Sequence, residues 1–176
     1  MELVIIGAAI GCMVMWAILV CRRLTILNEN VSRAMSRIGV QLSLCFDAVM
    51  EFLEETGRYA GDPRIIMEAV NRCRTPLTGS STPEEVKRQE NVLSDALRRI
   101  RTAAAKYPGL TKSRVYVGTM GAVDGYLKTA DTGRLIYNDN VTKLNRELIM
   151  FPTSLMGRML GLNKREYLAA TEFIKE

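Results

Sequence analysis

Apolar residues in the middle of the chain recur every three or four positions, which is the spacing of one face of an α-helix. They form one stripe without any proline, and this stripe predicts a helix over residues 24–57 with coiled-coil-like packing. Its positions are Leu24, Leu27, Val31, Met35, Ile38, Leu42, Cys45, Val49 and Phe52. Because no segment shows the two-residue alternation of a strand, we expect an all-α protein.

Local start and stop signals predict three further helices. Asp62-Pro63 gives an N-cap followed by proline, and Thr82 with Glu85 gives a capping box. Tyr107-Pro108-Gly109 is a stop signal, after which a second long stripe begins. The predicted helices cover 24–57, 63–74, 83–106 and 111–149. Since short loops join them, we expect an antiparallel up-and-down four-helix bundle over residues 23–150.

The N-terminus carries an uncharged apolar run. Leu3–Cys21 has 19 residues, and as a helix it would span about 28 Å, close to the thickness of bilayer hydrocarbon. A signal peptide is the alternative, but Glu2 stands where such a peptide carries basic residues, and no small-residue cleavage site closes the run. We therefore predict that residues 1–22 form an uncleaved transmembrane anchor whose helix continues into the bundle.

Flanking charge predicts the orientation of this anchor. Arg22 and Arg23 follow the apolar run, whereas no basic side chain precedes it. The positive-inside rule then places the N-terminus outside and the bundle in the bacterial cytoplasm, beneath the inner membrane. Trp16 is expected near the cytoplasmic interface. Gly7 and Gly11 form a GxxxG pair that lets two spans pack closely, which makes them candidate homo-oligomer contacts.

Residues 151–176 begin with an apolar stretch that contains Arg158 and is followed by Lys164. One interpretation is a cap over the bundle. The other is a short interfacial helix that presses apolar side chains toward lipid while its basic residues reach head groups. The candidate membrane or oligomer contacts here are Phe151, Leu155, Met156, Met159 and Leu160.

Composition excludes several kinds of chemistry. The 176 residues include no histidine and four cysteines without a CxxC pair, which argues against histidine-dependent triads and common zinc sites. Adjacent carboxylates such as Glu54-Glu55 do not face each other on a helix. The charge of +5 fits an anionic leaflet better than nucleic acid, because no reading motif is present. We expect no catalytic residues, metal or cofactor, and thus no enzyme.

Charged residues interrupt two of the apolar stripes, at positions 90 and 134. A charge in a packed seam is costly unless it is paired. The carboxylates of Asp47 and Glu90 are the candidate partners for Arg134. The alternative is a binding site for an anionic or polar ligand. Neighbouring polar residues are expected to close the bundle by packing and hydrogen bonding. The predicted polar seam comprises Asp47, Glu90, Arg134, Tyr137, Asn138 and Asn145.

Four segments together resemble the LemA family of bacterial membrane proteins: QLSLCFDAVMEFLEETGRYAGDP, EEVKRQENVLSDALRRI, KYPGL and RLIYNDNVTKLNRELIMFPTSLMGRMLGL. Arg134, Tyr137-Asn138, Asn145 and Phe151-Pro152 are the most specific part of the match. One departure is Met50-Glu51, where the family commonly has Pro-Asn. The resemblance implies a single-pass anchor, a cytoplasmic bundle of four helices and no known enzymatic activity.

Two functional hypotheses follow from these features. The first is a non-catalytic, membrane-anchored scaffold that self-associates and organises or remodels the membrane. The second is a monomeric, membrane-tethered adaptor or regulatory module that docks a cytoplasmic protein.

Overall fold

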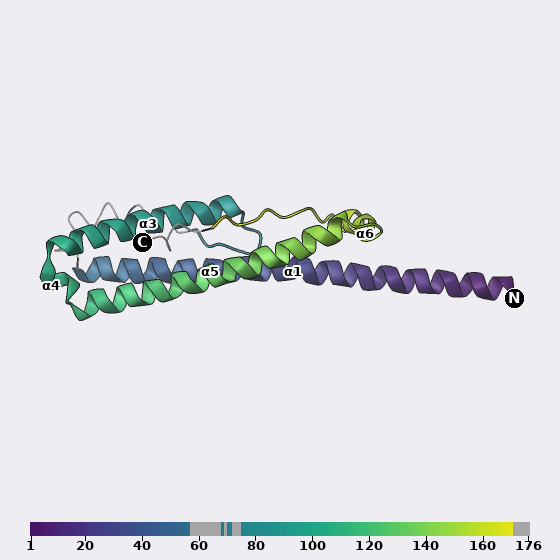
Figure 1. The fold of residues 1–176 in the computed structure, drawn as a ribbon, viewed down its shortest axis with the longest axis horizontal. Helices are drawn as coiled ribbons and strands as arrows, with labels where there is room; N and C mark the ends of the chain where they lie inside the picture. The colour runs from purple at the N-terminus through teal and green to yellow at the C-terminus, as the bar shows by residue number, and fades with distance from the viewer. Residues whose placement is uncertain (57–67, 69, 72–74, 171–176) are drawn as a thin grey trace.

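The computed structural model describes residues 1–56, 68, 70–71 and 75–170, and every regular element within these ranges is a helix (Figure 1). The all-α prediction is confirmed for them. The elements are α1 (Glu2–Thr56), α3 (Pro83–Lys106), α4 (Pro108–Thr111), α5 (Arg114–Ile149) and α6 (Thr153–Met159). Most of the predicted helix 63–74 lies outside the described residues, so the four-helix arrangement stays a prediction.

Helix α1 joins the predicted anchor to the bundle without a break. It has 55 residues and is therefore about 82 Å long. Its buried residues begin at Val20, and apart from the half-buried Ala17 the apolar residues before that point are exposed along the part that projects beyond the bundle (Figure 1). Among the described residues, α1 is the one helix long and apolar enough to cross a membrane.

The bundle is built around the antiparallel pair α1 and α5, with α3 packed on α1 (Figure 1). Their apolar stripes meet in one core, in which Phe46, Phe52 and Leu93 are fully buried. Small residues allow close approach: a Cβ placed on Gly39 would lie 2.7 Å from the Cβ of Leu77. The loop after residue 75 can therefore press directly onto α1.

Local signals fix the ends of α3 and α5. Thr82 accepts a hydrogen bond from the N–H of Glu85, whose carboxylate accepts one from the N–H of Thr82, so the predicted capping box is present. The predicted stop after α3 is occupied by the one-turn helix α4, which opens with Pro108. Ser113 then caps α5 by accepting from the N–H of Tyr116.

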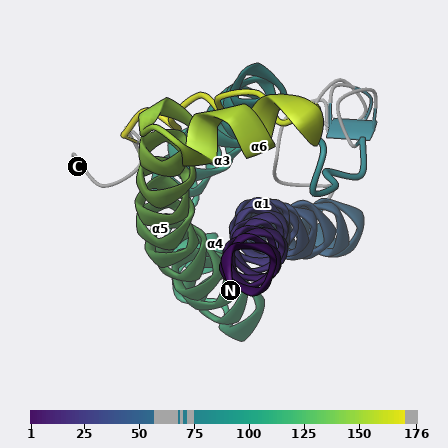
Figure 2. The same ribbon diagram turned by 90° about the vertical axis from the view of Figure 1, so that its right-hand side faces the viewer.

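Helix α6 closes the end of the bundle from which the N-terminal part of α1 projects (Figure 2). It contacts both α1 and α5. Gly157 is buried against Leu148, and a Cβ at this position would overlap the leucine side chain. At the same level, the guanidinium of Arg23 lies 2.7 Å from the carboxylate of Glu147. These contacts place α6 where α1 leaves the bundle.

Candidate functional site

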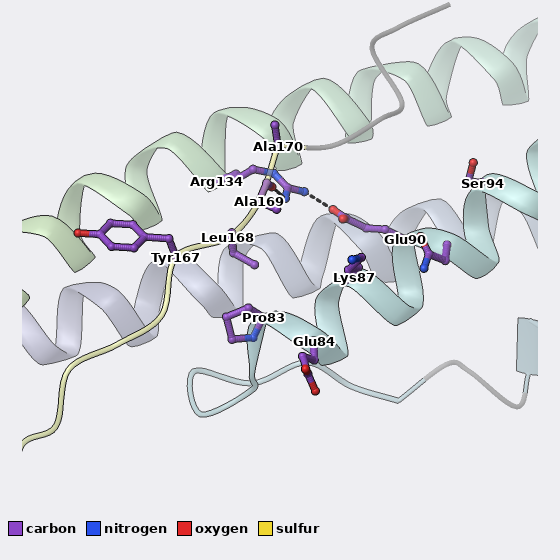
Figure 3. A pocket seen from close by; sticks show the side chains of 11 residues that line it. Pro83, Glu84, Lys87, Glu90, Ser94, Arg134, Tyr167, Leu168, Ala169 and Ala170 are labelled. Atoms are coloured by element: carbon purple, nitrogen blue, oxygen red, sulfur yellow. Dashed lines mark hydrogen bonds and ion pairs between the residues drawn. The ribbon is translucent and has the colours of Figure 1, made fainter.

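A buried ion pair joins α5 to α3. The guanidinium of Arg134 donates a hydrogen bond to the carboxylate of Glu90 (Figure 3), and the two side chains are only 5% and 11% exposed. The Nε of Arg134 has no hydrogen-bond partner among the described residues and lies 3.7 Å from a carboxylate oxygen of Asp131. Because the core stripe of each helix carries one member of the pair, the two charges meet inside the bundle.

The same arginine also holds the C-terminal segment. After α6, residues 162–170 form no helix and run back along α5 in the opposite direction. Arg134 donates from its second terminal nitrogen to the carbonyl oxygen of Ala169. We call residues 162–170 the tail. Arg134 therefore connects three parts of the molecule: α5, α3 and the tail.

Two asparagines on α5 bind the tail backbone in the same manner. The amide of Asn138 donates to the carbonyl of Leu168 and accepts from its N–H, both at 2.9 Å. The amide of Asn145 does the same with Arg165, at 2.8 and 2.9 Å. Each asparagine thus serves one tail residue as a neighbouring β-strand would, by offering one donor and one acceptor.

The spacing of the asparagines matches the spacing of the tail residues they hold. Asn138 and Asn145 lie seven residues apart on α5, which corresponds to about 10.5 Å along a helix. Leu168 and Arg165 lie three residues apart in the tail, which corresponds to about 10 Å in an extended chain. This agreement fixes the register of the tail without any regular sheet.

Side chains complete the attachment of the tail. Tyr137 is buried, and its hydroxyl donates to the carbonyl of Glu166 at 3.0 Å. Burial raises the pKa of this tyrosine, so the hydroxyl keeps its proton as a donor at neutral pH. Leu168 is 4% exposed and enters the core, while the Arg165 guanidinium donates to the side-chain oxygen of Asn28 on α1, at 3.3 Å.

A cavity of about 340 Å³ lies between the tail and the first half of α3 (Figure 3). Two acidic and two basic side chains line it, namely Glu84, Glu90, Lys87 and Arg134. Two of these are already joined in the buried ion pair. The charges of these four described side chains balance.

One predicted seam residue is placed differently. Asp47 is exposed on α1, and it is not the residue that meets Arg134. Its neighbours Cys45, Phe46 and Val49 are all fully buried. At about 100° per residue, this leaves Asp47 on the opposite side of α1. The carboxylate that meets Arg134 is therefore that of Glu90.

The predicted membrane-contact residues fall into two groups. Gly7, Gly11 and Trp16 lie on the projecting part of α1, and a Cβ at either glycine would meet open space. The second group gathers where α1 enters the bundle. It comprises Arg22, Arg23, Phe151, Leu155, Met159 and Leu160, all exposed, and the half-buried Met156.

The sequence matches the model of the LemA family over residues 34–176. The chain belongs to the LemA family. The match covers most of the chain and includes every residue that binds the tail from α5. The LemA match begins at Ala34, inside α1, so it does not extend over the apolar segment. Among curated proteins, no match is found.

Sequence reasoning did not find what the LemA polar residues bind. The sequence predicts that Tyr137, Asn138 and Asn145 pack and hydrogen-bond to close the bundle, and in the structure their hydrogen bonds go to the backbone of the tail. Leu168 was missed as a core residue because no periodic stripe includes it. One signal was available: a seven-residue spacing puts both asparagines on one face of α5.

Proposed function

We propose that this protein is a non-catalytic, membrane-anchored scaffold that self-associates and holds a rigid helical bundle at the cytoplasmic face of the bacterial inner membrane. One observation supports the proposal most directly. A single helix carries an exposed apolar segment into a buried core with no break between them. Because the span and the bundle share one continuous helix, two spans that pair in the membrane also hold their bundles side by side.

The apolar segment also supports self-association. Outside the neighbouring backbone of its own helix, a Cβ at Gly7 or Gly11 would meet no atom of the described residues within 4 Å, so that face of the helix is open to a neighbour. Without a hydrophobic driving force inside a bilayer, close backbone packing at small residues is what joins spans. A repeated contact of this kind closes into a ring or runs on as an array.

The positive charge of the α3 surface does not favour nucleic acid. Arg98 and Arg99 both bond the carboxylate of Asp95, at 2.5 and 2.9 Å. Arg101 lies 3.7 Å from the carboxylate of Asp124. Each of these arginines already faces a carboxylate of the chain, which weakens its attraction for a nucleic-acid phosphate.

The scaffold is tested by measuring the mass of the full-length protein in mild detergent. We expect a discrete species larger than a dimer, and a smaller one when Gly7→Leu is combined with Gly11→Leu. The matched control combines Ala9→Leu with Met13→Leu, which adds leucines on the opposite face and should leave the mass unchanged. A monomeric wild-type protein would contradict self-association.

In that event the monomeric adaptor becomes the better hypothesis, and the cavity beside the tail is the feature that favours it. Orientation has a separate test. With the bundle in the cytoplasm, Asn163→Cys should react with a membrane-impermeant reagent only after intact cells are permeabilised. Equal labelling before permeabilisation would place the bundle outside.

A further inference from the structure

The chain between α5 and the tail exposes an unusual number of large apolar side chains. Phe151 is 85% exposed and Met159 is 75% exposed, although both lie in an ordered turn and helix. We call this surface the α6 patch; it comprises Ile149, Met150, Phe151, Leu155, Met159 and Leu160. Contiguous apolar patches of this kind mark a surface that another body covers.

The position of the α6 patch in the fold indicates what covers it. Helix α6 contacts α1, and the buried part of α1 begins at Val20, where the apolar segment ends. The ion pair between Arg23 and Glu147 joins α1 to the end of α5 at the same level. If the apolar segment spans the bilayer, the patch therefore lies at the interface between lipid tails and head groups.

The charges around the patch are mainly positive. Arg22, Arg146, Arg158 and Lys164 are all exposed at this end of the molecule, whereas the nearby Glu147 is held by Arg23. Apolar side chains surrounded by basic ones fit an anionic bilayer surface. A symmetric contact with a second copy fits less well, because it would bring the same basic side chains together.

The patch is also held in one orientation. Gly157 packs against Leu148, and the hydroxyl of Thr153 lies within hydrogen-bond distance of the carbonyl oxygens of Glu147 and Met150, at 2.7 and 2.6 Å. On the other side, Asn145 holds the tail that follows α6. A surface fixed from both sides presents the same side chains to the membrane without a cost in ordering them.

We propose that the α6 patch is a second membrane contact, which binds the surface of a bilayer rich in anionic lipid. The inference rests on the anchor in the proposed function but not on self-association. Its components have distinct roles. Phe151, Leu155 and Met159 enter the boundary between head groups and acyl chains, and Arg158 with Lys164 binds lipid phosphates.

The test places a single tryptophan in the full-length protein, reconstituted into vesicles of phosphatidylglycerol and phosphatidylcholine with brominated acyl chains. In a Trp16→Phe background, Met159→Trp reports on the patch. Val117→Trp is the matched control, because Val117 is also 60% exposed but lies 32 residues before Ile149 on α5, about 48 Å away. We expect strong quenching of the first tryptophan and little of the second.

A charge variant tests the lipid preference. Each basic residue near an anionic surface contributes about a fivefold preference for binding, so Arg158→Gln with Lys164→Gln should lower the ratio of docked to free patch by about 25-fold. Quenching of the tryptophan at 159 should then fall in phosphatidylglycerol vesicles. It should change little in vesicles of phosphatidylcholine alone.

The remaining outcomes overturn the inference in distinguishable ways. Quenching at 159 no greater than at 117 means that the patch stays in water. A blue-shifted but unquenched tryptophan at 159 means that a second copy covers the patch, which supports self-association instead. Trp16 of the wild-type protein reports on the anchor. If the brominated lipid does not quench its fluorescence, the apolar segment does not enter the bilayer, and both the anchor and the membrane contact of the patch are contradicted.

Discussion

Removal of the Arg134 guanidinium is the sharpest test of how the bundle is held together. Arg134→Ala leaves the carboxylate of Glu90 buried, 11% exposed, with its main positive partner gone. It also removes the donor that bonds the carbonyl of Ala169 in the tail. The substitution therefore acts on α3 and on the tail at once, although it changes one residue of α5.

The magnitude follows from the burial of both charges. Breaking a buried ion pair from one side costs about 3–5 kcal/mol, since an uncompensated charge stays in the core. For a chain of this length, 1 kcal/mol shifts the thermal midpoint by about 2–4 °C. We expect the midpoint of Arg134→Ala to fall by about 6–20 °C in full-length protein in detergent, followed by circular dichroism.

Two comparisons separate burial from charge. Lys143 and Asp139 form an ion pair on the same helix at 2.6 Å, with side chains 57% and 59% exposed, so Lys143→Ala should cost no more than about 1 kcal/mol. Glu90→Leu combined with Arg134→Met removes both buried charges and should recover most of the loss. A midpoint for Arg134→Ala equal to that of Lys143→Ala would refute the reasoning.

Two further predictions concern the tail and the core thiol. Asn138→Leu removes both bonds to the Leu168 backbone and should cost about 2 kcal/mol; the Leu168 amide should exchange hydrogen faster, while the Arg165 amide, still bound by Asn145, should not. Burial, reinforced by Asp124, raises the pKa of Cys45 to about 12. The thiol ionises near pH 9 in the unfolded chain but not in the folded one. The stability that this residue contributes is therefore complete below pH 9 and falls as pH rises toward 12. Denaturant midpoints of the wild type that do not change across this range, relative to those of Cys45→Ala, would contradict the prediction.

The sequence predicted those parts of the fold that local signals determine. Helix α3 begins at Pro83 and ends at Lys106, as expected, because a capping box and a proline act within a few residues. The long apolar stripe of α1 predicted which face of this helix is buried, because that face contacts the core along the whole length of the bundle. Both kinds of signal depend on side chains close together in the sequence.

The tail escaped prediction for a physical reason. Its partners on α5 bind carbonyl and N–H groups, which every residue carries, so the tail sequence holds no complementary pattern. The choice between Asp47 and Glu90 as the partner of Arg134 depends on how α1 is rotated about its axis within the bundle. Residue spacing along one helix does not specify this rotation.

The two proposed membrane contacts together fix the orientation of the protein in the membrane. A single span fixes the depth of a protein but leaves it free to rotate about the helix axis. A second contact displaced from that axis, such as the α6 patch, removes this freedom, because the ion pair of Arg23 with Glu147 and the packing of Gly157 lock α6 to the bundle. Neighbouring copies would then meet with the same faces in the same orientation. A repeated contact needs that constancy to close into a defined assembly, so loss of the patch should broaden the distribution of assembled masses even where the glycines of the span are intact.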